Sequence, residues 1–569
     1  MTAAAARWIL PEAPQAQAAA LARDIGVSAL VARILIKRGY GEAEPANRFL
    51  RPSLGDMHDP GAMTGMGAAA ARLARAVREK EPVLLYGDYD VDGTSSVVIL
   101  KKSLEMLGAG ADFHVPHRLK DGYGMRPEVV TEAAARGVKL IVSVDTGIRA
   151  LDVCRHAGEL GVDVIVTDHH LPESELPPAA AVVNPNQPGC PYPEKNLCGA
   201  GVAFKLAQAL WREMGVPETR AARLTDSFLK LVAIATVADV VPLTGENRII
   251  VSHGLRGLGH TPNPGLRALL SVAGFEEGSA PTAGQVAFRI APRINAAGRM
   301  DTAKAVIEML LTPDAGRARA IAAELHELNA DRQATEARML EDALKACEAE
   351  PVDENRRGLV FAGDGWHRGV VGIVASRLVE RFHRPVFVIG IDADRGEASG
   401  SGRSAAGFHL LESLESMADL FLKFGGHRQA AGLTLRADRI DEFRERFNEY
   451  VRGKLAPEDL RPRFEPDAVA TLGELDPRTL QEIGALAPFG YANPAPLFAV
   501  LGADIPSAPS VMKEKHLRFR IRQDGRWFGC KAWNWAERME TVVSAREFLL
   551  SVEEDTYAGG WVANLKDAR

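Results

Sequence analysis

The chain has 569 residues, of which 46% are hydrophobic and 25% are charged, and its formal net charge is -6. This length exceeds what one hydrophobic core organises, so it predicts three or four domains. The mild negative charge excludes a basic coat protein and an acidic tail, and any binding of nucleic acid must therefore depend on local basic patches.

Cysteine usage and the N-terminus indicate the compartment. The cysteines are scattered and none forms a C-x-x-C pair, which argues against zinc and fits a reducing environment. The first apolar run is broken at Pro11 and is too short for a signal peptide. No window approaches the roughly 18 apolar residues of a membrane span, so a cytoplasmic protein without a membrane partner is expected. The five cysteines are Cys154, Cys190, Cys198, Cys347 and Cys530.

Residues 1–55 have helical spacing and predict a small helical segment, to which no chemistry is assigned. From Gly67 onward, helices and strands alternate, which is typical of an α/β domain with a doubly wound parallel sheet. The predicted strands are Val83–Tyr86, Phe113–Pro116, Lys139–Val144 and Val162–Val166. The predicted helices are Ala68–Lys80, Arg126–Arg136 and Ile148–Leu160.

Acidic residues follow the first of these strands at alternate positions, as Asp88, Asp90 and Asp92. In an extended segment they share one side, where they repel one another unless a hard divalent cation lies among them. Gly93 permits a tight turn, and Thr94 or Ser95 is predicted to cap the helix that follows. This stretch alone leaves two interpretations open, a metal site and a solvated acidic turn.

More potential ligands lie where later elements end. Two strands deliver acids and imidazoles, and an apolar helix that begins near Asp226 ends in an acid just before Pro242. Oxygen donors with one or two imidazoles suit Mn²⁺ or Mg²⁺ better than a closed zinc site. Two metals held in this way activate water for phosphoryl displacement, which predicts a phosphoesterase. These later residues are Asp145, Asp168, His169, His170 and Asp239.

A basic loop is predicted over Ala291–Asp301, where Arg293, Asn295 and Arg299 lie among small residues. Arginine forks suit phosphate, although a salt-bridged turn explains the same pattern. Pro313–Glu350 is free of internal breakers after its first turn and predicts one long helix that links two domains.

A second α/β pattern follows, with a strand at Gly358–Phe361, a helix at Val370–Phe382 and a strand at Pro385–Ile389. Two glycine-rich segments come next, starting at Gly400 and Phe424. Neither has Walker or dinucleotide spacing. Flexible backbone beside basic residues predicts a phosphate cradle, and ordinary turns are the alternative. The basic residues are Arg403, His427 and Arg428.

Beyond residue 456, short strands separated by turn residues predict a β-barrel. The most informative strand has an apolar row, and Arg518, Arg520 and Arg522 form a basic row on its other face. Asp524-Gly525 predicts a hairpin turn. Basic strands with aromatic side chains hold single-stranded nucleic acid, although at least half of these aromatics are expected to fill the core. The aromatic residues are Trp527, Phe528, Trp533 and Trp535.

The motifs G-D-Y-D-V-D-G, V-D-T-G, T-D-H-H and V-A-D-V-V-P-L follow one another in this order and resemble the DHH phosphoesterase superfamily. With R-I-N-A-A-G-R, L-N-A-D-R-Q, S-G-R-S and F-G-G-H-R-Q-A-A-G, the chain from about Pro82 to its end resembles the RecJ exonucleases of that superfamily. The resemblance implies 5′-to-3′ degradation of single-stranded DNA to mononucleotides in DNA repair and recombination. It implies that the helical segment (1–55) is followed by a DHH catalytic domain (56–312), a linker helix (313–350), a DHHA1 domain (351–455) and an OB-fold domain (456–569).

The resemblance also assigns roles to residues. Asp145 would bridge two Mn²⁺ or Mg²⁺ ions, and His170 would act at the scissile phosphate. Asp88 and Asp168 would support catalysis by holding histidine ligands or water molecules. The metal ligands would be Asp90, Asp92, Asp145, His169 and Asp239. The DNA-binding or phosphate-binding residues would be Arg293, Asn295, Arg299, Ser401, Arg403 and His427, to which the basic strand adds Arg518, Arg520 and Arg522.

Single-stranded DNA is the expected substrate of a monomer, with single-strand binding protein and a RecQ-type helicase as candidate partners. Two other functions stay open on the sequence. One is cleavage of a small phosphate ester, for which the C-terminal module would be superfluous. The other is a binding subunit that has lost catalysis, which should show gaps among the acids.

Overall fold

The computed structural model describes residues 6–12, 14–117, 122, 124–299, 303–405, 407–555 and 559–569. It divides into two compact units. One unit comprises Met1–Ile9 and Asn329–Glu465, and the other comprises Leu10–Leu328 and Pro466–Arg569.

The larger unit contains the predicted parallel sheet, whose strand order is β3-β2-β4-β5-β6 with every neighbouring pair parallel. From β2 the chain first adds β3 on one side of the sheet and then β4, β5 and β6 on the other side. The direction in which strands are added therefore reverses at the boundary between β2 and β4. Ligands of doubly wound sheets bind beyond the strand ends at this reversal. The strands are β2 (Val83–Tyr86), β3 (Ala111–His114), β4 (Leu140–Val144), β5 (Asp163–Thr167) and β6 (Ala181–Val183).

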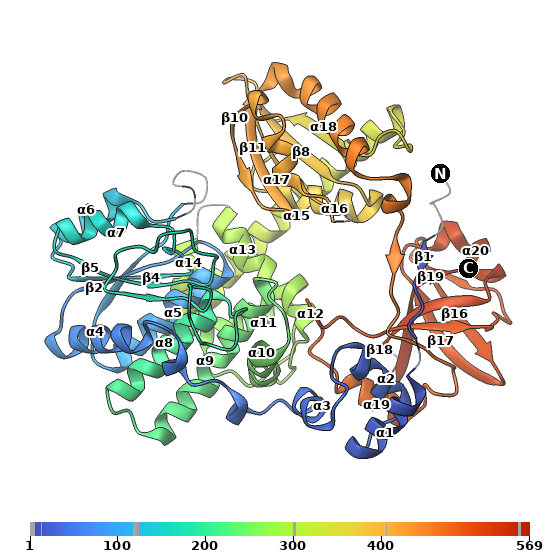
Figure 1. Ribbon diagram of the computed structural model, residues 1–569, viewed down its shortest axis with the longest axis horizontal. Helices are drawn as coiled ribbons and strands as arrows, with labels where there is room; N and C mark the ends of the chain where they lie inside the picture. The colour runs from blue at the N-terminus through green and yellow to red at the C-terminus, as the bar shows by residue number, and fades with distance from the viewer. Residues whose placement is uncertain are drawn as a thin grey trace. The chain divides into compact units, whose positions relative to one another are not determined.

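Helices cover both faces of this sheet (Figure 1). Alternate residues of β2 separate the two cores, because Val83 and Leu85 pack in one cluster whereas Leu84 and Tyr86 pack in the other. The first face carries α4 (Met66–Glu79), α5 (Val91–Met106) and α8 (Gly199–Glu213), and the second carries α6 (Pro127–Ala135) and α7 (Leu151–Glu159).

A helical layer extends the first core, and it corrects one prediction. The segment expected to be a basic loop from Ala291 is helical as far as Arg299; residues 300–302 lie outside the described part of the chain. Ala and Arg favour a helix here, and Pro292, which cannot donate a hydrogen bond, follows a π-turn in which Ala291 N–H donates to Val286 O. The layer comprises α9 (Glu218–Ala238), α10 (Gly245–Leu258), α11 (Pro264–Val272), α12 (Ala283–Gln285), the π-helix η3 (Val286–Ile290), α13 (Ala291–Arg299) and α14 (Ala303–Leu311).

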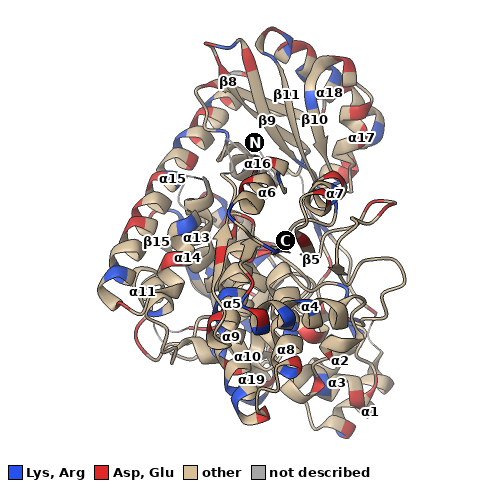
Figure 2. Cartoon of the chain, turned by 90° about the vertical axis from the view of Figure 1, so that its left-hand side faces the viewer, with Lys and Arg blue, Asp and Glu red and all other residues tan. Residues whose placement is uncertain are grey.

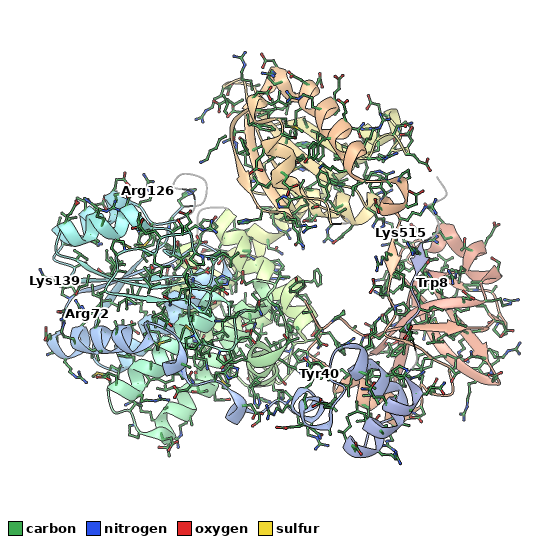
Figure 3. All side chains as sticks on the ribbon, viewed as in Figure 1. Trp8, Tyr40, Arg72, Arg126, Lys139 and Lys515 are labelled. Carbon is green, nitrogen blue, oxygen red and sulfur yellow. The ribbon has the colours of Figure 1, made fainter. Side chains whose placement is uncertain are left out.

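The C-terminal part of this unit is a seven-stranded sheet of order β13-β14-β18-β19-β17-β16-β15. Its core is shared with the N-terminal helices, since Leu35 and Phe49 belong to the same buried cluster as Phe498 and Phe548. Tyr40, labelled in Figure 3, packs on Phe49 with ring centroids 4.4 Å apart. The N-terminal helices are α1 (Gln15–Ile25), α2 (Ala29–Lys37) and α3 (Ala43–Leu50), followed by the short 3-10 turns η1 (Leu54–Asp56) and η2 (Pro60–Ala62). The strands are β13 (Ala468–Val469), β14 (Leu497–Leu501), β15 (Ser510–Met512), β16 (His516–Gln523), β17 (Arg526–Ala532), β18 (Glu547–Glu554) and β19 (Trp561–Ala568), with helices α19 (Pro477–Gly484) and α20 (Met539–Ser544) between them.

The linker prediction corresponds to one helix, α15 (Ala315–Ala349), along which acidic and basic residues are interspersed (Figure 2). Within the smaller unit, its end is held to α16 (Val371–Phe382), because Glu336 forms ion pairs with Arg332 and with Arg377. The linker helix and the domain after it therefore share a polar contact.

The sheet of the smaller unit, of order β10-β11-β9-β8-β7, corrects a second prediction. The glycines at the start of both segments lie in paired strands: the first segment begins in β9, and the second comprises the end of β10, a turn at residues 427–429 and the start of β11. A Cβ added to Gly402 would lie 2.4 Å from the Phe387 ring on the adjacent strand, so glycine here serves close strand packing. The elements are β7 (Leu359–Asp364), β8 (Val386–Asp392), β9 (Glu397–Arg403), β10 (Phe421–Gly426) and β11 (Ala430–Arg436), with α17 (Leu410–Glu415) and α18 (Ile440–Lys454); β1 (Arg7–Trp8) pairs with β12 (Arg463–Phe464).

Candidate metal centre

The acidic loop after β2 turns into helix earlier than predicted. Asp90 is the N-cap of α5, and its carboxylate accepts a hydrogen bond of 2.9 Å from Gly93 N–H. The predicted caps at Thr94 and Ser95 are therefore wrong, and Asp92 lies in the first helical turn instead of on an extended segment. A Cβ on Gly93 would lie 2.6 Å from the main chain of Asp88, so glycine lets the strand end and the helix start approach closely.

A distant helix holds Asp92. Its two carboxylate oxygens accept hydrogen bonds from Gly199 N–H (2.6 Å) and Ala200 N–H (2.7 Å), the first backbone donors of α8. The positive end of that helix stabilises the negative charge of Asp92. Asp92 thus connects the start of α5, on which it lies, to the start of α8.

The acids and one imidazole predicted from separate strand ends do converge. His169 Nε2 lies 3.2 Å from Asp145 Oδ1, 3.7 Å from Asp239 Oδ2 and 3.8 Å from Asp92 Oδ2. Ligand atoms of Asp88, Asp90 and Asp145 also lie within 4.8 Å of one another, as do those of Asp92, His169 and Asp239, and those of Asp145, His169 and His170. Because Asp145 belongs to two of these groups, its position suits a ligand shared between two ions.

A left-handed backbone conformation occurs at two places in this cluster, at one acid and at the residue that follows another. Asp145 itself has φ +59°, and Val240, directly after Asp239, has φ +58°. A β-branched residue such as valine rarely adopts this conformation, which is typical of strained functional sites. The backbone thus presents both carboxylates from sharp turns.

Burial and mutual repulsion change the protonation of the acids. Burial raises the pKa of Asp145 well above its ordinary value, and the neighbouring carboxylates, first of all Asp92, raise it further. Burial likewise raises the pKa of Asp239 to about 9, with Asp92 and Asp90 adding to the effect. Burial lowers the pKa of His169, which favours the neutral imidazole that binds metals. Crowded carboxylates beside a neutral imidazole fit a hard divalent cation, which would remove their repulsion.

The affinity for Mn²⁺ is expected to rise with pH towards about 9. Asp239 and Asp145 must give up protons that their raised pKa values retain, so each displaced proton is worth about tenfold in apparent Kd per pH unit below that pKa. Titration calorimetry at two pH values, in buffers of different ionisation enthalpy, measures the Kd and the protons released. A Kd that does not change with pH, without proton release, would contradict the site as described.

His170 belongs to a separate dyad beside the ligand cluster. Its Nδ1 lies 2.7 Å from Asp168 Oδ1, and Asp168 also accepts the main-chain N–H groups of Ile148, His169 and His170. Burial opposes the charge of Asp168, but these hydrogen bonds and His170 lower its pKa overall. Burial likewise disfavours a charged His170, and the bond to Asp168 outweighs this and raises its pKa. His170 is thus held as a proton donor by an ionised carboxylate.

The predicted phosphate-binding residues divide among three places. Arg293, on α13, donates to His326 Nδ1 at 3.1 and 3.2 Å. Asn295 accepts a hydrogen bond of 3.3 Å from the N–H of Val91, the first residue of α5 after the acidic loop. Asn295 therefore also supports the acidic loop. The side chain of Arg299 lies outside the described part of the chain.

The second group lies in the smaller unit. Ser401 and Arg403 both lie on β9, where the arginine donates to the serine hydroxyl at 2.8 Å. His427 lies in the turn between β10 and β11, and its N–H donates to Ala430 O. The smaller unit thus presents a serine, a guanidinium and an imidazole from neighbouring strands and their turn.

The third group is the basic row of β16, which alternates with buried Leu517, Phe519 and Ile521 as predicted. Arg522 is held by both carboxylate oxygens of Asp504, and Arg518 and Arg520 are exposed. Asp524 and Gly525 have positive φ and form the predicted hairpin turn. Of the aromatics, Trp527 and Trp533 are half exposed, Phe528 is partly buried and Trp535 is buried, so two remain for stacking.

An apolar cleft of about 500 Å³ adjoins the metal cluster, and sequence reasoning missed it. Val240, Phe288 and Tyr491 line it with exposed side chains, and among its lining residues there is no charged side chain. Its residues come from three distant segments, of which two include residues of the motifs V-A-D-V-V-P-L and R-I-N-A-A-G-R, but nothing in the sequence indicated that they form one cleft. They are Val237, Ala238, Val240, Val241, Leu243, Ala283, Gly284, Ala287, Phe288, Ala291, Pro292, Asn295, Phe489, Gly490, Tyr491, Pro494 and Ala495.

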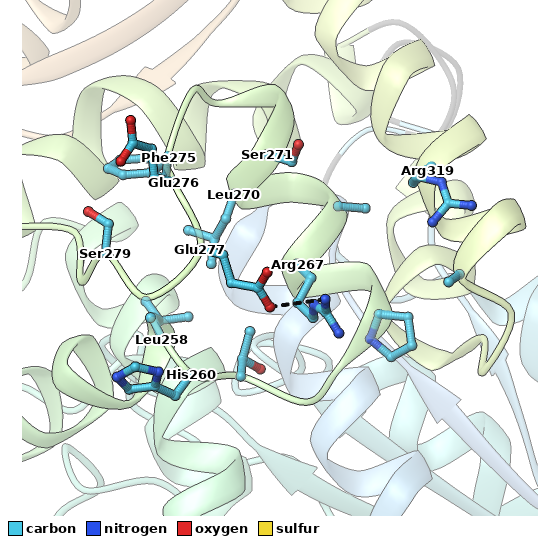
Figure 4. A pocket seen from close by; sticks show the side chains of 15 residues that line it. Leu258, His260, Arg267, Leu270, Ser271, Phe275, Glu276, Glu277, Ser279 and Arg319 are labelled. Carbon is cyan, nitrogen blue, oxygen red and sulfur yellow. Dashed lines mark hydrogen bonds and ion pairs between the residues drawn. The ribbon is translucent and has the colours of Figure 1, made fainter.

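A second hollow, of about 550 Å³, lies among α10, α11 and the start of α15 (Figure 4). Arg267 and Glu277 pair within it at 3.1 Å, and its lining includes no predicted site residue. Volume alone therefore does not locate the chemistry.

Comparison with known proteins assigns the domains. Residues 82–236 match the DHH family N-terminal domain, 355–453 match the DHHA1 domain, and 466–566 match the RecJ OB domain. The single-stranded-DNA-specific exonuclease RecJ of Bacillus subtilis (strain 168) is 40% identical over 544 residues, which are 95% of this chain and 68% of that protein. RecJ of Escherichia coli (strain K12) is 39% identical over 482 residues, 82% of each chain. The chain belongs to the RecJ family.

Solved structures support the same assignment. RecJ from Thermus thermophilus in complex with Mn²⁺ matches with a TM-score of 0.82 at 33% identity, covering 99% of this chain and 79% of that chain. Its complex with Mg²⁺ matches with a TM-score of 0.76 at 32% identity, covering 99% and 78%. The RecJ resemblance and the α/β fold class with a C-terminal OB domain are thus confirmed. No helix in the described part of this RecJ-family chain is long and apolar enough to cross a bilayer.

Proposed function

We propose that this protein is a metal-dependent exonuclease that hydrolyses single-stranded DNA from the 5′ end to mononucleotides, in DNA repair and recombination. The observation that carries the proposal is the complete acid and imidazole cluster beside an uncharged apolar cleft. The cleft suits bases, whereas the cluster suits a phosphate. The RecJ relatives named for this activity support it.

The metal centre would hold two ions, Mn²⁺ or Mg²⁺. When bound, they supply activation of a water molecule and stabilisation of the negative charge that develops on the phosphate. Asp145 would be shared between them, and Asp88, whose carboxylate lies in one of the three groups, is a further candidate ligand. The proposed ligands are Asp90, Asp92, Asp145, His169 and Asp239.

His170 would move a proton at the scissile phosphate. An ionised carboxylate only accepts hydrogen bonds, so Asp168 holds the hydrogen on His170 Nδ1 and leaves Nε2 for the exchange. Arg293, Ser401, Arg403 and His427 would bind backbone phosphates, together with Asn295 and Arg299. The exposed row of Arg518 and Arg520, with Arg522 and two tryptophans, would hold the strand further from the metals.

The purified chain with Mn²⁺ is expected to release mononucleotides from a 5′-labelled single strand and to leave blunt duplex intact. A 3′-labelled strand should shorten progressively, because removal starts at the other end, and chelation of the metal should stop both reactions. Release from the 3′ end first would contradict the polarity. Hydrolysis of dinucleotides or cyclic dinucleotides without hydrolysis of long strands would favour the small-ester alternative.

We further propose a cytoplasmic location, which the five free cysteines support. Single-strand binding protein and a RecQ-type helicase are the proposed partners, since one covers and the other produces the single strand. The protein is proposed to act as a monomer.

A further inference from the structure

Three successive carbonyl groups of the D-H-H-L segment each accept a hydrogen bond from a different side chain. Asn186 Nδ2 donates to His169 O at 2.7 Å, and Asn184 Nδ2 donates to His170 O at 2.9 Å. Arg149 Nε donates to the next carbonyl, that of Leu171, at 3.1 Å. These donors come from outside the motifs that carry the family resemblance.

The opposite side of the same backbone is fixed as well. Asp168 accepts the N–H groups of His169 at 2.7 Å and of His170 at 3.1 Å. The peptide plane between His169 and His170 is held at both its carbonyl and its N–H, and the planes on either side of it are each held at one group. These bonds restrict rotation of the planes, and the planes that flank each Cα set the direction of its Cα–Cβ bond. The two histidine side chains are therefore aimed by main-chain hydrogen bonds, to which His170 adds the bond of its own ring to Asp168.

The asparagines reach this segment because a short edge strand brings them there. β6 has three residues, pairs with β5 as far as Thr167 and Val183, and is followed at once by Asn184. Asn184 is fully buried, and its Oδ1 accepts the N–H of Asn186 at 2.7 Å, which joins the two donors in one turn. Removing the amide of Asn184 therefore affects both bonds, whereas removing that of Asn186 affects one.

We infer that Asn186 and Asn184 are positioning residues, the first for the proposed metal ligand His169 and the second for the proposed proton donor His170. The inference rests on the proposed function. It assigns them unequal effects, because the carbonyl that Asn186 binds lies in the peptide plane between His169 and His170, whereas the carbonyl that Asn184 binds lies in a plane that flanks only His170. Asn186 acts on metal affinity, and Asn184 acts mainly on turnover once the metal is bound.

The test measures metal binding apart from catalysis. For Asn186→Ala, the Kd for Mn²⁺, measured by calorimetry or by the electron paramagnetic resonance of free Mn²⁺ without DNA, should rise about tenfold or more, in the range of losses for partners of metal ligands. The melting temperature without metal should stay near that of the wild type. For Asn184→Asp, which keeps the acceptor oxygen and loses the donor, kcat on single-stranded DNA at saturating Mn²⁺ should fall about tenfold with KM little changed.

Asn196→Ala is the matched control, because Asn196 is an exposed asparagine of the same unit whose side-chain amide donates to Glu194 at 3.3 Å and to no carbonyl of the D-H-H-L segment. Mn²⁺ affinity and kcat that equal those of the control in both variants would overturn the inference. A loss of Mn²⁺ affinity and of kcat that accompanies a proportionate fall in melting temperature would also overturn the inference, because it would show a merely structural role. If the wild type binds Mn²⁺ but does not cleave DNA, the proposed function fails, and the Kd of Asn186→Ala still decides the role of Asn186.

Discussion

Asp145→Asn is expected to reduce hydrolysis of single-stranded DNA by more than about 10³-fold, since partners that only orient metal ligands are already worth about 10–100-fold. The same change should raise the melting temperature of the metal-free protein. Because the folded pKa of Asp145 is raised, the folded state binds more protons than the unfolded state, so stability falls as pH rises from about 4 towards that pKa. Asparagine removes this loss, and it tolerates the positive φ of the site.

Activity with Mn²⁺ and calorimetric melting with and without Mn²⁺ check both halves of this expectation. Asp152→Asn is the matched control, because Asp152 lies exposed on α7, where it pairs with Arg155 at 2.6 Å, away from the acid cluster. Unchanged cleavage by Asp145→Asn would show that the active metal site lies elsewhere. A lower metal-free melting temperature would contradict the repulsion among the acids.

Glu246→Leu is expected to destabilise the protein by about 3–5 kcal/mol, the usual cost of leaving a buried charge without its partner. Glu246 and Lys205 are both buried and lie 2.5 Å apart. The glutamate also accepts Tyr192 OH at 2.6 Å and His58 N–H at 3.0 Å. Burial lowers the pKa of Lys205 and Glu246 opposes this, so the lysine depends on the glutamate for its charge.

Denaturant-induced unfolding, monitored by a spectroscopic signal that reports on the larger unit, measures this loss of stability. The double variant Lys205→Met with Glu246→Leu should recover a large part of it, because no charge then stays buried, although Tyr192 and His58 still lack their acceptor. A double variant as unstable as Glu246→Leu would show that the loss comes from packing. The ion pair would then contribute little.

The parallel sheet and the convergence of acids at its edge were predictable from sequence, because apolar strand runs that lead to Asp88, Asp145 and Asp168 are local signals. The order of the strands and the short edge strand β6 were not predicted. The contacts of Asp92 were not predictable, since its carboxylate accepts hydrogen bonds from Gly199 and Ala200, more than a hundred positions away. Long-range contacts of this kind leave no periodicity in the sequence.

The same limit explains the other corrections. The glycine-rich strands looked like loops because glycine has a low strand propensity, and only the Phe387 ring on the neighbouring strand explains Gly402. The sequence analysis assigned no role to Asn184 and Asn186, because the carbonyls that they bind follow another strand and leave no local signal. Motif order identified the family, whereas these supporting contacts required coordinates.

The core shared by the first helices and the last strands has a consequence for biosynthesis. Phe49 leaves the ribosome long before Phe498, with which it shares a buried cluster. At about 5–20 residues per second, the roughly 450 intervening residues take about 20 to 90 s to translate. During that time the apolar faces of α1–α3 lack the part of the shared core that the C-terminal strands supply. The nascent chain is therefore a natural client for a holding chaperone, and its C-terminal domain completes folding only after release.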